Sequence, residues 1–341
     1  MDIHKNTNLH KAKTAKNDEF YTQLSDIERE LGHYKEYFKG RVVFCNCDDP
    51  QESDFWQYFS LNFEFLGLKK LISTHFEIEV PSYKLEIVRD INNDGKVNQL
   101  DTIKTPLKQN GDFRSPECIE ILKESDIVVT NPPFSLFREY VSQLIEYDKK
   151  FIIMGNNNAI TYKEIFKLIK EGNIWLGYNS NKTMEFRLDD SYIKWDRVDI
   201  ETGDKYGSVP AISWYTNLET KKRHEDLILY KTYYGNENEY PKYDNYDAIN
   251  VDKTKDIPID YDGAMGVPIT FLDKYNPEQF EIISCNDVRT NSETPFKEHG
   301  LIKDKDSAIN GKPTYVRIVI KKKENSNEIV MGGRSAVAAG Q

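Results

Sequence analysis

The chain has 341 residues and a formal net charge of −10. This length predicts about two domains, and the acidic balance excludes a protein that coats nucleic acid through a uniformly basic surface. The four cysteines lack the spacing of a zinc site or a redox pair, and no apolar run is long enough to span a bilayer, so we expect a reduced, cytoplasmic protein with no membrane segment.

The first part of the chain is polar and then becomes helical. Residues 1–17 are polar and basic, and we expect a mobile N-terminal arm there. Residues 27–34 repeat apolar side chains at helical spacing. Tyr21 and Thr22 lie just before this helix, where they would either cap it or close over a cofactor.

Residues 41–47 predict the first β-strand, and a helix is predicted from Ser53. The end of the strand and the following turn contribute four candidate cofactor residues, namely Cys45, Asn46, Asp48 and Asp49. A strand, an acidic turn and a helix begin a βαβ unit, and nucleotide-like cofactors bind at such turns. The turn has no Gly-x-Gly, which argues against a pyrophosphate held on backbone amides and favours an ammonium group held by a carboxylate.

A second strand is predicted at 70–76 and an extended segment at 83–88. Residues 90–101 then match the spacing of a calcium loop, with Gly95 at the sixth place and Asp101 at the twelfth. The preceding segment is β-like instead of helical, and the Asn-Asp-Gly sequence alone explains a tight turn. We predict no metal site, with calcium in this loop as the alternative.

Asp112 and Phe113 precede a predicted helix that has Ser115 as its cap and Pro116 in its first turn. An acid and an aromatic ring at a strand end would hydrogen-bond an adenine amine and pack against the purine. The alternative is an aspartate in an ordinary loop turn.

The apolar run 126–129 leads into Asn131, Pro132, Pro133 and Phe134, which predicts a buried strand that ends in a rigid loop. The Asn131 side-chain oxygen and the Pro132 carbonyl would accept both hydrogens of a base amine and direct its lone pair at a methyl donor. The prolines offer no N–H and have a fixed φ, so no donor competes. Phe134 would stack on a flipped base. The alternative is that the prolines only end the strand.

The next segments continue the alternation of strands and helices. A strand is predicted at 149–155, a helix at 165–169, and paired strands at 173–178 and 209–215. Residues 18–220 are therefore predicted to form one α/β domain.

The composition changes after about residue 220, where tyrosines, asparagines and prolines crowd the chain. This texture is typical either of a loop-rich recognition surface or of irregular packing, and order returns at 266–272, 280–283 and 315–320. Basic clusters at 10–16, 221–224 and 321–323 would either contact nucleic acid or form solvated surface. Residues 331–341 are small and predict a flexible tail.

Five motifs in this order resemble the EcoRI-type adenine-specific DNA methyltransferases, over about residues 18–320. They are Asp-Glu-Phe-Tyr-Thr, Cys-Asn-Cys-Asp-Asp-Pro, Gly-Asp-Phe, Asn-Pro-Pro-Phe and Met-Gly-Val-Pro-Ile-Thr-Phe-Leu. The resemblance implies a Rossmann-like methyltransferase sheet with helices on both faces in residues 18–220, and a target-recognition region in 221–330. It also implies transfer of a methyl group from S-adenosyl-L-methionine to adenine N6 in a specific double-stranded DNA sequence, with base flipping.

The resemblance assigns roles to the candidate residues. Residues 131–134 would be the catalytic motif, Asp112 and Phe113 would contact the adenine of the cofactor, and Tyr21 and Thr22 would lie at its methionine end. Residues 45–49 would stand in for a first motif that usually contains glycines. The acid usual after the second strand has no evident counterpart near His75.

Two other functions stay open at this level. An rRNA base-amine methyltransferase would share the Asn-Pro-Pro-Phe motif, and a DNA-binding protein that has lost catalysis would explain the missing glycines. A cognate restriction endonuclease acting on the same site is a possible partner in function, with no stable complex implied.

Overall fold

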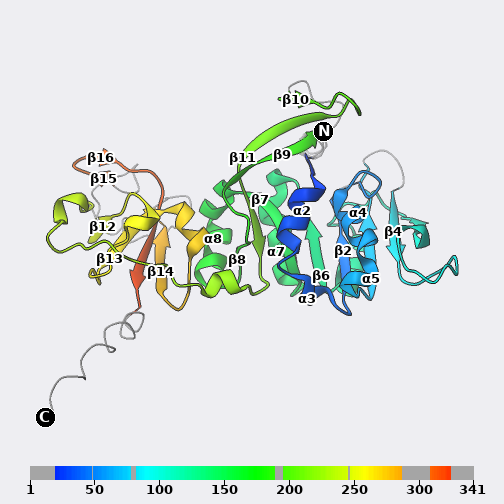
Figure 1. The fold of residues 1–341 in the computed structure, drawn as a ribbon, viewed down its shortest axis with the longest axis horizontal. Coiled ribbons are helices and arrows are strands. Elements are labelled where there is room, and N and C mark those ends of the chain that lie inside the picture. The colour runs from blue at the N-terminus through cyan, green and yellow to red at the C-terminus, as the bar shows by residue number, and fades with distance from the viewer. Residues whose placement is uncertain are drawn as a thin grey trace, which may run out of the picture. The chain divides into compact units, whose positions relative to one another are not determined.

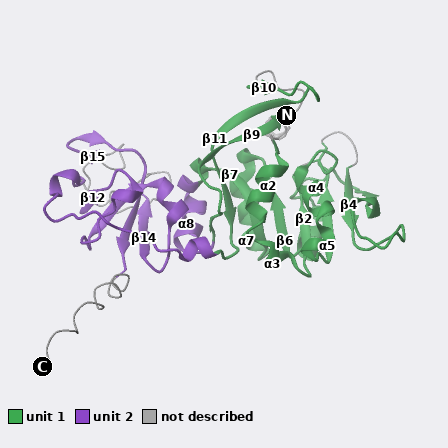
Figure 2. Cartoon of the chain, in the orientation of Figure 1, with its two compact units in different colours: residues 1–159, 174–220 green, residues 160–173, 221–341 purple. Residues whose placement is uncertain are grey.

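The computed structural model describes residues 20–47, 49–77, 82–188, 195–244, 246–285 and 308–323. The predicted arm at 1–17, the predicted tail at 331–341 and the candidate residue Asp48 lie outside these ranges. The chain forms two compact units (Figure 2). The first comprises residues 1–159 and 174–220, and the second comprises residues 160–173 and 221–341.

A mixed β-sheet, with 11 strands among the described residues, forms the centre of the first unit (Figure 1). Its strand order is β1-β9-β11-β7-β6-β2-β3-β4-β5, and β8 and β10 also pair with β11. The four central strands are parallel: β7 (Lys150–Asn156), β6 (Ile127–Thr130), β2 (Val42–Cys45) and β3 (Lys70–Thr74). The others are β1 (Phe20–Thr22), β4 (Tyr83–Ile87), β5 (Ile103–Pro106), β8 (Trp175–Leu176), β9 (Lys182–Leu188), β10 (Arg197–Val198) and β11 (Lys205–Thr216), each antiparallel to a neighbour.

Helices cover both faces of this sheet. One face packs against α2 (Leu24–Leu31), α3 (Lys35–Phe38), α4 (Asp54–Leu61) and α5 (Phe63–Leu66). Val43 and Val129 belong to that core, whereas the alternate residues Phe44 and Val128 are equally buried on the opposite face. There α6 (Pro116–Glu124) and α7 (Phe137–Glu146) contact β2 and β7. The central strands are apolar because both of their faces are covered, and the predicted α/β fold is confirmed.

The predicted Ser115 cap is confirmed, and Ser53, where a helix was predicted to start, also acts as a cap. The Ser53 hydroxyl accepts the N–H of Phe55 at the start of α4. The Ser115 hydroxyl accepts the N–H of Cys118, and Pro116 occupies the first turn of α6. Each cap satisfies a backbone donor that the helix itself leaves unpaired.

The connections that follow β2 and β6 lead to opposite sides of this pair of strands: the next strand after β2 is β3, and the next strand after β6 is β7. From β2 the chain passes through α4 and α5 to β3, its neighbour on one side, whereas β6 lies next to β2 on the other side. This arrangement creates a topological switch point between β2 and β6. Ligands in open α/β sheets bind outside the carboxyl ends of the strands at such a point.

Strand β11 extends well beyond the carboxyl end of β7. Ile212 pairs with Asn156, the last residue of β7, so residues 205–211 continue past that strand and pair with β9 and β10. This extension spans roughly 20 Å. A β-bulge lies where it leaves the sheet, with Ala211 at φ 58°. We call residues 182–188 and 195–211 the hairpin arm; its strands rise above the ends of the central strands in Figure 1.

The edge of the sheet differs from the sequence prediction. The predicted pairing of 173–178 with 209–215 is confirmed in part, since β8 pairs with β11. However, β11 is an interior strand, and β9 and β1 were missed. Tyr21 and Thr22 belong to β1, which pairs with β9, instead of capping a helix. Three residues are too few to show an alternating pattern.

The second unit contains a separate four-stranded sheet among its described residues, in the order β12-β13-β17-β14. Its strands are β12 (Ala248–Asn250), β13 (Ala264–Pro268), β17 (Arg317–Lys322) and β14 (Phe280–Cys285). A two-stranded ribbon joins β15 (Ala308–Ile309) to β16 (Lys312–Pro313), and α8 (Lys163–Lys170) packs on β14. The segments predicted to be ordered at 266–272, 280–283 and 315–320 fall on β13 with the turn after it, β14 and β17.

Short 3₁₀ turns fill much of the remaining chain. They are η1 (Gln99–Asp101), η2 (Phe134–Leu136), η3 (Asn157–Thr161), η4 (Lys221–His224), η5 (Glu237–Glu239), η6 (Thr254–Asp256) and η7 (Ile269–Lys274). Some tyrosines of the second unit are packed in its interior and others face solvent: Tyr243 is buried, whereas Tyr230 and Tyr234 are exposed. Among the helices of the described ranges, none has the length and apolarity needed to cross a bilayer.

Gly111 joins the loop after β5 to the residue after β3. Its φ is +78°, and a Cβ at this position would lie 1.8 Å from the carbonyl oxygen of His75. Both the backbone conformation and the close approach therefore require glycine.

We predict that Gly111→Ala lowers the free energy of unfolding by about 4 kcal/mol or more, because backbone must move to admit the methyl group. Gly95→Ala is the matched control, since Gly95 has φ +84° and no neighbour within 4 Å of a built Cβ. That change should lower the free energy of unfolding by only about 1–2 kcal/mol, the cost of holding alanine in a left-handed conformation. Urea denaturation of both variants measures the difference, and equal costs would contradict the close packing of Gly111.

Candidate active site

The predicted catalytic loop and the predicted cofactor turn lie side by side at the switch point. Asn46 follows β2 and Asn131 follows the neighbouring strand β6, and both are buried, with 3% and 6% of their surface exposed. The Thr130 hydroxyl donates a hydrogen bond to the Asn46 carbonyl oxygen. This bond ties the ends of the two strands together.

The strand β6 ends at Thr130, and the loop after it leads into η2. The Pro133 carbonyl accepts the N–H of Leu136 at 2.9 Å, which begins η2. The Pro132 carbonyl, which follows Asn131 directly in the chain, is not the acceptor of this turn. Phe134 is half-buried and packs on the apolar core beneath α2 and α4.

The turn after β2 adopts a glycine-like conformation without glycine. Cys47 has φ 74°, in the left-handed region. The Tyr140 hydroxyl, from α7, donates to Asn46 Oδ1 and also contacts the Cys47 side chain. Burial, reinforced by Cys47, raises the pKa of Tyr140 well above its usual value, so the phenol keeps its proton. These side-chain contacts hold a turn that contains no glycine.

Asp49 is held within the protein at the far side of this turn. Its Oδ1 accepts the Tyr83 hydroxyl at 3.0 Å and the Gln51 N–H at 2.9 Å, while its Oδ2 lies 3.7 Å from His75 Nε2. The His75 and Tyr83 rings stack with centroids 4.7 Å apart. Burial and the Asp49 carboxylate raise the pKa of Tyr83. Sequence reasoning did not find His75 and Tyr83 as partners, because their approach depends on the pairing of β3 with β4.

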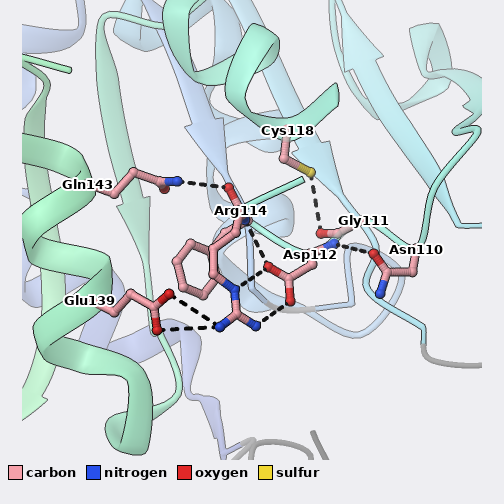
Figure 3. A network of polar contacts seen from close by, with 8 residues as sticks. Asn110, Gly111, Asp112, Arg114, Cys118, Glu139 and Gln143 are labelled. Atoms are coloured by element: carbon pink, nitrogen blue, oxygen red, sulfur yellow. Dashed lines mark hydrogen bonds and ion pairs between the residues drawn. The ribbon is translucent and has the colours of Figure 1, made fainter. Parts of the chain in front are cut away.

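Asp112 forms a two-pronged ion pair with Arg114 (Figure 3). The Arg114 Nε and backbone N–H each donate to Oδ1 at 2.8 Å, and Nη2 donates to Oδ2 at 2.7 Å. Burial alone would raise the pKa of Asp112, but the bonds and charge of Arg114 outweigh it, so the pKa lies below its usual value. A carboxylate has about four acceptor positions, so one position on Oδ2 is left for a ligand.

Phe113 is positioned from α7. Its carbonyl accepts the Gln143 amide at 3.2 Å, and its ring meets the Tyr140 ring edge-on at 5.0 Å. Arg114 lies over the same ring and contacts Glu139 at 3.3 Å. Figure 3 shows Glu139 and Gln143 reaching this loop from one helix.

Tyr21 and Thr22 have different environments. The Thr22 hydroxyl donates to the sulfur of Met154 at 3.1 Å and is buried. Tyr21 is partly exposed beneath the guanidinium of Arg187, 4.8 Å from its ring centre. Only Tyr21 of this pair therefore offers its side chain to a ligand.

The calcium-like loop at residues 90–101 lies at the opposite end of the sheet, because β4 runs antiparallel to β3 and carries the chain away from the carboxyl ends. Its carboxylates accept backbone donors: Asp90 bonds the Gly95 N–H at 2.9 Å, and Asp101 bonds the Ile91 N–H at 2.8 Å. Over the described part of the chain, no group of three or more His, Cys, Asp or Glu side chains is placed to hold a metal.

Comparison with known proteins covers both units. The family model described as adenine-specific methyltransferase EcoRI matches residues 8–323. The chain is 51% identical over 327 residues to the Type II methyltransferase M.EcoRI of Escherichia coli, covering 92% of this chain and 96% of that protein. It is 43% identical over 330 residues to M.MpnI of Mycoplasma pneumoniae, covering 93% and 98%, and 41% identical over 328 residues to M.MgeORF184P of Mycoplasma genitalium, covering 93% and 99%. Residues 131–134, 45–49 and 112–113 all fall within the matched residues, and the chain belongs to the EcoRI family of adenine-specific methyltransferases.

Proposed function

We propose that this protein transfers a methyl group from S-adenosyl-L-methionine to the N6 amine of adenine in a specific double-stranded DNA sequence. The observation that carries the proposal is the junction of the Asn131 loop with the Asn46 turn at the switch point of the sheet. Such a junction brings a methyl donor and a base amine to one place.

The residues around the junction fit the cofactor. Asp112 keeps one acceptor position for an adenine amine, and the Phe113 ring lies beside it. The Asp49 carboxylate would hold the ammonium group, and Tyr21 would lie at the methionine end. When bound, S-adenosyl-L-methionine supplies an activated methyl group on a positively charged sulfur.

The catalytic loop would act by positioning. Asn131 Oδ1 and the Pro132 carbonyl accept the two N–H groups of the adenine amine and direct the nitrogen lone pair toward the methyl group. Hydrogen bonds are stronger in a buried site than in water, and Asn131 is buried. Phe134 supplies a stacking face for the flipped base. Transfer of the methyl group would leave the cofactor as a neutral thioether and the base nitrogen positively charged, and that nitrogen would then lose its proton to water, so no strong base is needed.

The hairpin arm would contact the DNA duplex. It extends beyond the carboxyl ends of the strands, on the side of Asn131. Positively and negatively charged side chains are nearly equal in number among the residues of the arm, so charge alone would not attract DNA to it. The arm does expose apolar side chains, since Trp195 is 46% exposed and Ile200 is 99% exposed. Apolar side chains of this kind insert between base steps or pack in a groove. We assign sequence reading to this arm together with the target-recognition region at 221–330.

The activity would protect DNA from a cognate restriction endonuclease at the same site, without a stable complex between the two enzymes. We place it in the cytoplasm, where reduced cysteines persist.

Methyl transfer to duplex DNA distinguishes this function from its alternatives. Labelled S-adenosyl-L-methionine should label adenine in duplex DNA and leave ribosomal RNA unlabelled, and sequencing should map the modified site. Label in ribosomal RNA alone would support the rRNA enzyme. DNA binding without cofactor binding in calorimetry would support an inactive DNA-binding protein.

We predict that Asn131→Ala lowers the single-turnover methylation rate by about 10²–10³-fold, because an amine-positioning acceptor is lost. The Kd for S-adenosyl-L-methionine should change by less than about twofold, since Asn131 acts on the base and not on the cofactor. Asn98→Ala, which removes the side-chain cap of η1, is the control and should methylate normally. A fully active Asn131→Ala variant would refute the assigned role.

We predict that Phe134→Ala weakens binding of the flipped adenine by about 1–3 kcal/mol, the worth of a stacked base. Fluorescence of 2-aminopurine at the target position reports flipping directly. Phe65→Ala removes an exposed ring on α5 and should leave the signal unchanged. Identical flipping in both variants would exclude stacking on Phe134.

We predict that Ile200→Ala raises the Kd for duplex DNA about tenfold, equal to about 1.4 kcal/mol. Unfolding should be unaffected within about 0.5 kcal/mol, because the side chain is exposed. Leu100→Ala, an exposed residue on η1 at the opposite end of the sheet, is the matched control. Unchanged DNA affinity of Ile200→Ala in a fluorescence-anisotropy titration would remove the arm from the DNA interface.

A further inference from the structure

Tyr140 connects the two halves of the candidate active site. It lies on α7, which begins three residues after Phe134, and its side chain is fully buried. Its hydroxyl donates to Asn46 Oδ1 in the turn after β2. Asn46 also accepts the Thr130 hydroxyl through its carbonyl, so both of its oxygens are bonded within the protein.

The same helix holds the Asp112 loop. The Tyr140 ring supports the Phe113 ring, and the Gln143 amide bonds the Phe113 carbonyl. Glu139 contacts Arg114, which in turn holds Asp112 (Figure 3). One helix therefore fixes the catalytic loop at its start and both cofactor-facing segments along its side.

We propose that Tyr140 is a positioning residue for methyl transfer. Its hydroxyl fixes the Asn46 turn and its ring fixes Phe113, so that α7 sets the placement of the cofactor relative to Asn131. The inference rests on the proposed function, because it assumes that these two segments hold the cofactor.

Loss of the Tyr140 hydroxyl should lower the rate of methyl transfer, because this contact holds the turn after β2 in place. Cys47 holds a left-handed conformation next to Asn46, and such a conformation persists only where its surroundings enforce it. Removing the phenol oxygen leaves Asn46 Oδ1 without its donor and releases the turn. A misplacement of about 1 Å costs about 10²-fold in rate.

Tyr140→Phe tests the proposal by deleting only the hydroxyl. We expect the Kd for S-adenosyl-L-methionine to rise about tenfold in calorimetry and the single-turnover methylation rate to fall about 10–100-fold. The matched control is Tyr34→Phe, because Tyr34 is also fully buried and donates one hydrogen bond, to Glu30 at 3.0 Å. The control should lose similar thermal stability and keep wild-type affinity and rate.

A double variant separates positioning from packing. If Tyr140 acts through Asn46, Tyr140→Phe combined with Asn46→Ala should bind the cofactor as weakly as Asn46→Ala alone. Additive losses, or wild-type Kd and rate in Tyr140→Phe, would overturn the proposal. Gln143→Ala, which breaks only the bond to the Phe113 carbonyl, gives an independent reading and should raise the Kd by a smaller factor. Failure of the proposed function is distinct, since the wild-type protein itself would then neither bind S-adenosyl-L-methionine nor methylate DNA.

Discussion

The hydrogen bond from Thr130 to the Asn46 carbonyl is the constraint on which the candidate active site depends. Parallel strands bring their carboxyl ends to one edge of a sheet, but the loops that follow them are free to diverge. Here the side chain of the last residue of β6 binds the first residue after β2. This one hydrogen bond thereby connects the loop that would hold a base amine to the turn that would face the cofactor.

The second layer of support comes from α7. A cofactor turn with glycines closes tightly through backbone freedom alone, whereas this turn has Cys47 in the left-handed region and is held from outside by Tyr140. The Asp112 loop is likewise held through Arg114 and Phe113. Side-chain contacts from one helix therefore hold these segments, whereas a glycine-containing turn depends on its own backbone conformation.

Much of this architecture follows from sequence reasoning. The central strands are fully apolar because both faces are buried, and Ser53 and Ser115 mark their helices through capping chemistry. The loop after β6 was predictable because two prolines restrict its backbone. The partners of these groups were not predictable, because Tyr140 meets Asn46 and Tyr83 meets Asp49 only after distant segments pack together. Strand β1 was missed for the same reason, since its three residues gain their order from pairing with β9.

The bulge at Ala211 divides β11 into two parts with separate duties. Residues 212–216 are locked in register with β7, whereas the residues before the bulge belong to the arm. The pairing with β7 that places the Asn131 loop therefore does not include the arm, and the bulge separates variation in the arm from the strand register of the central sheet.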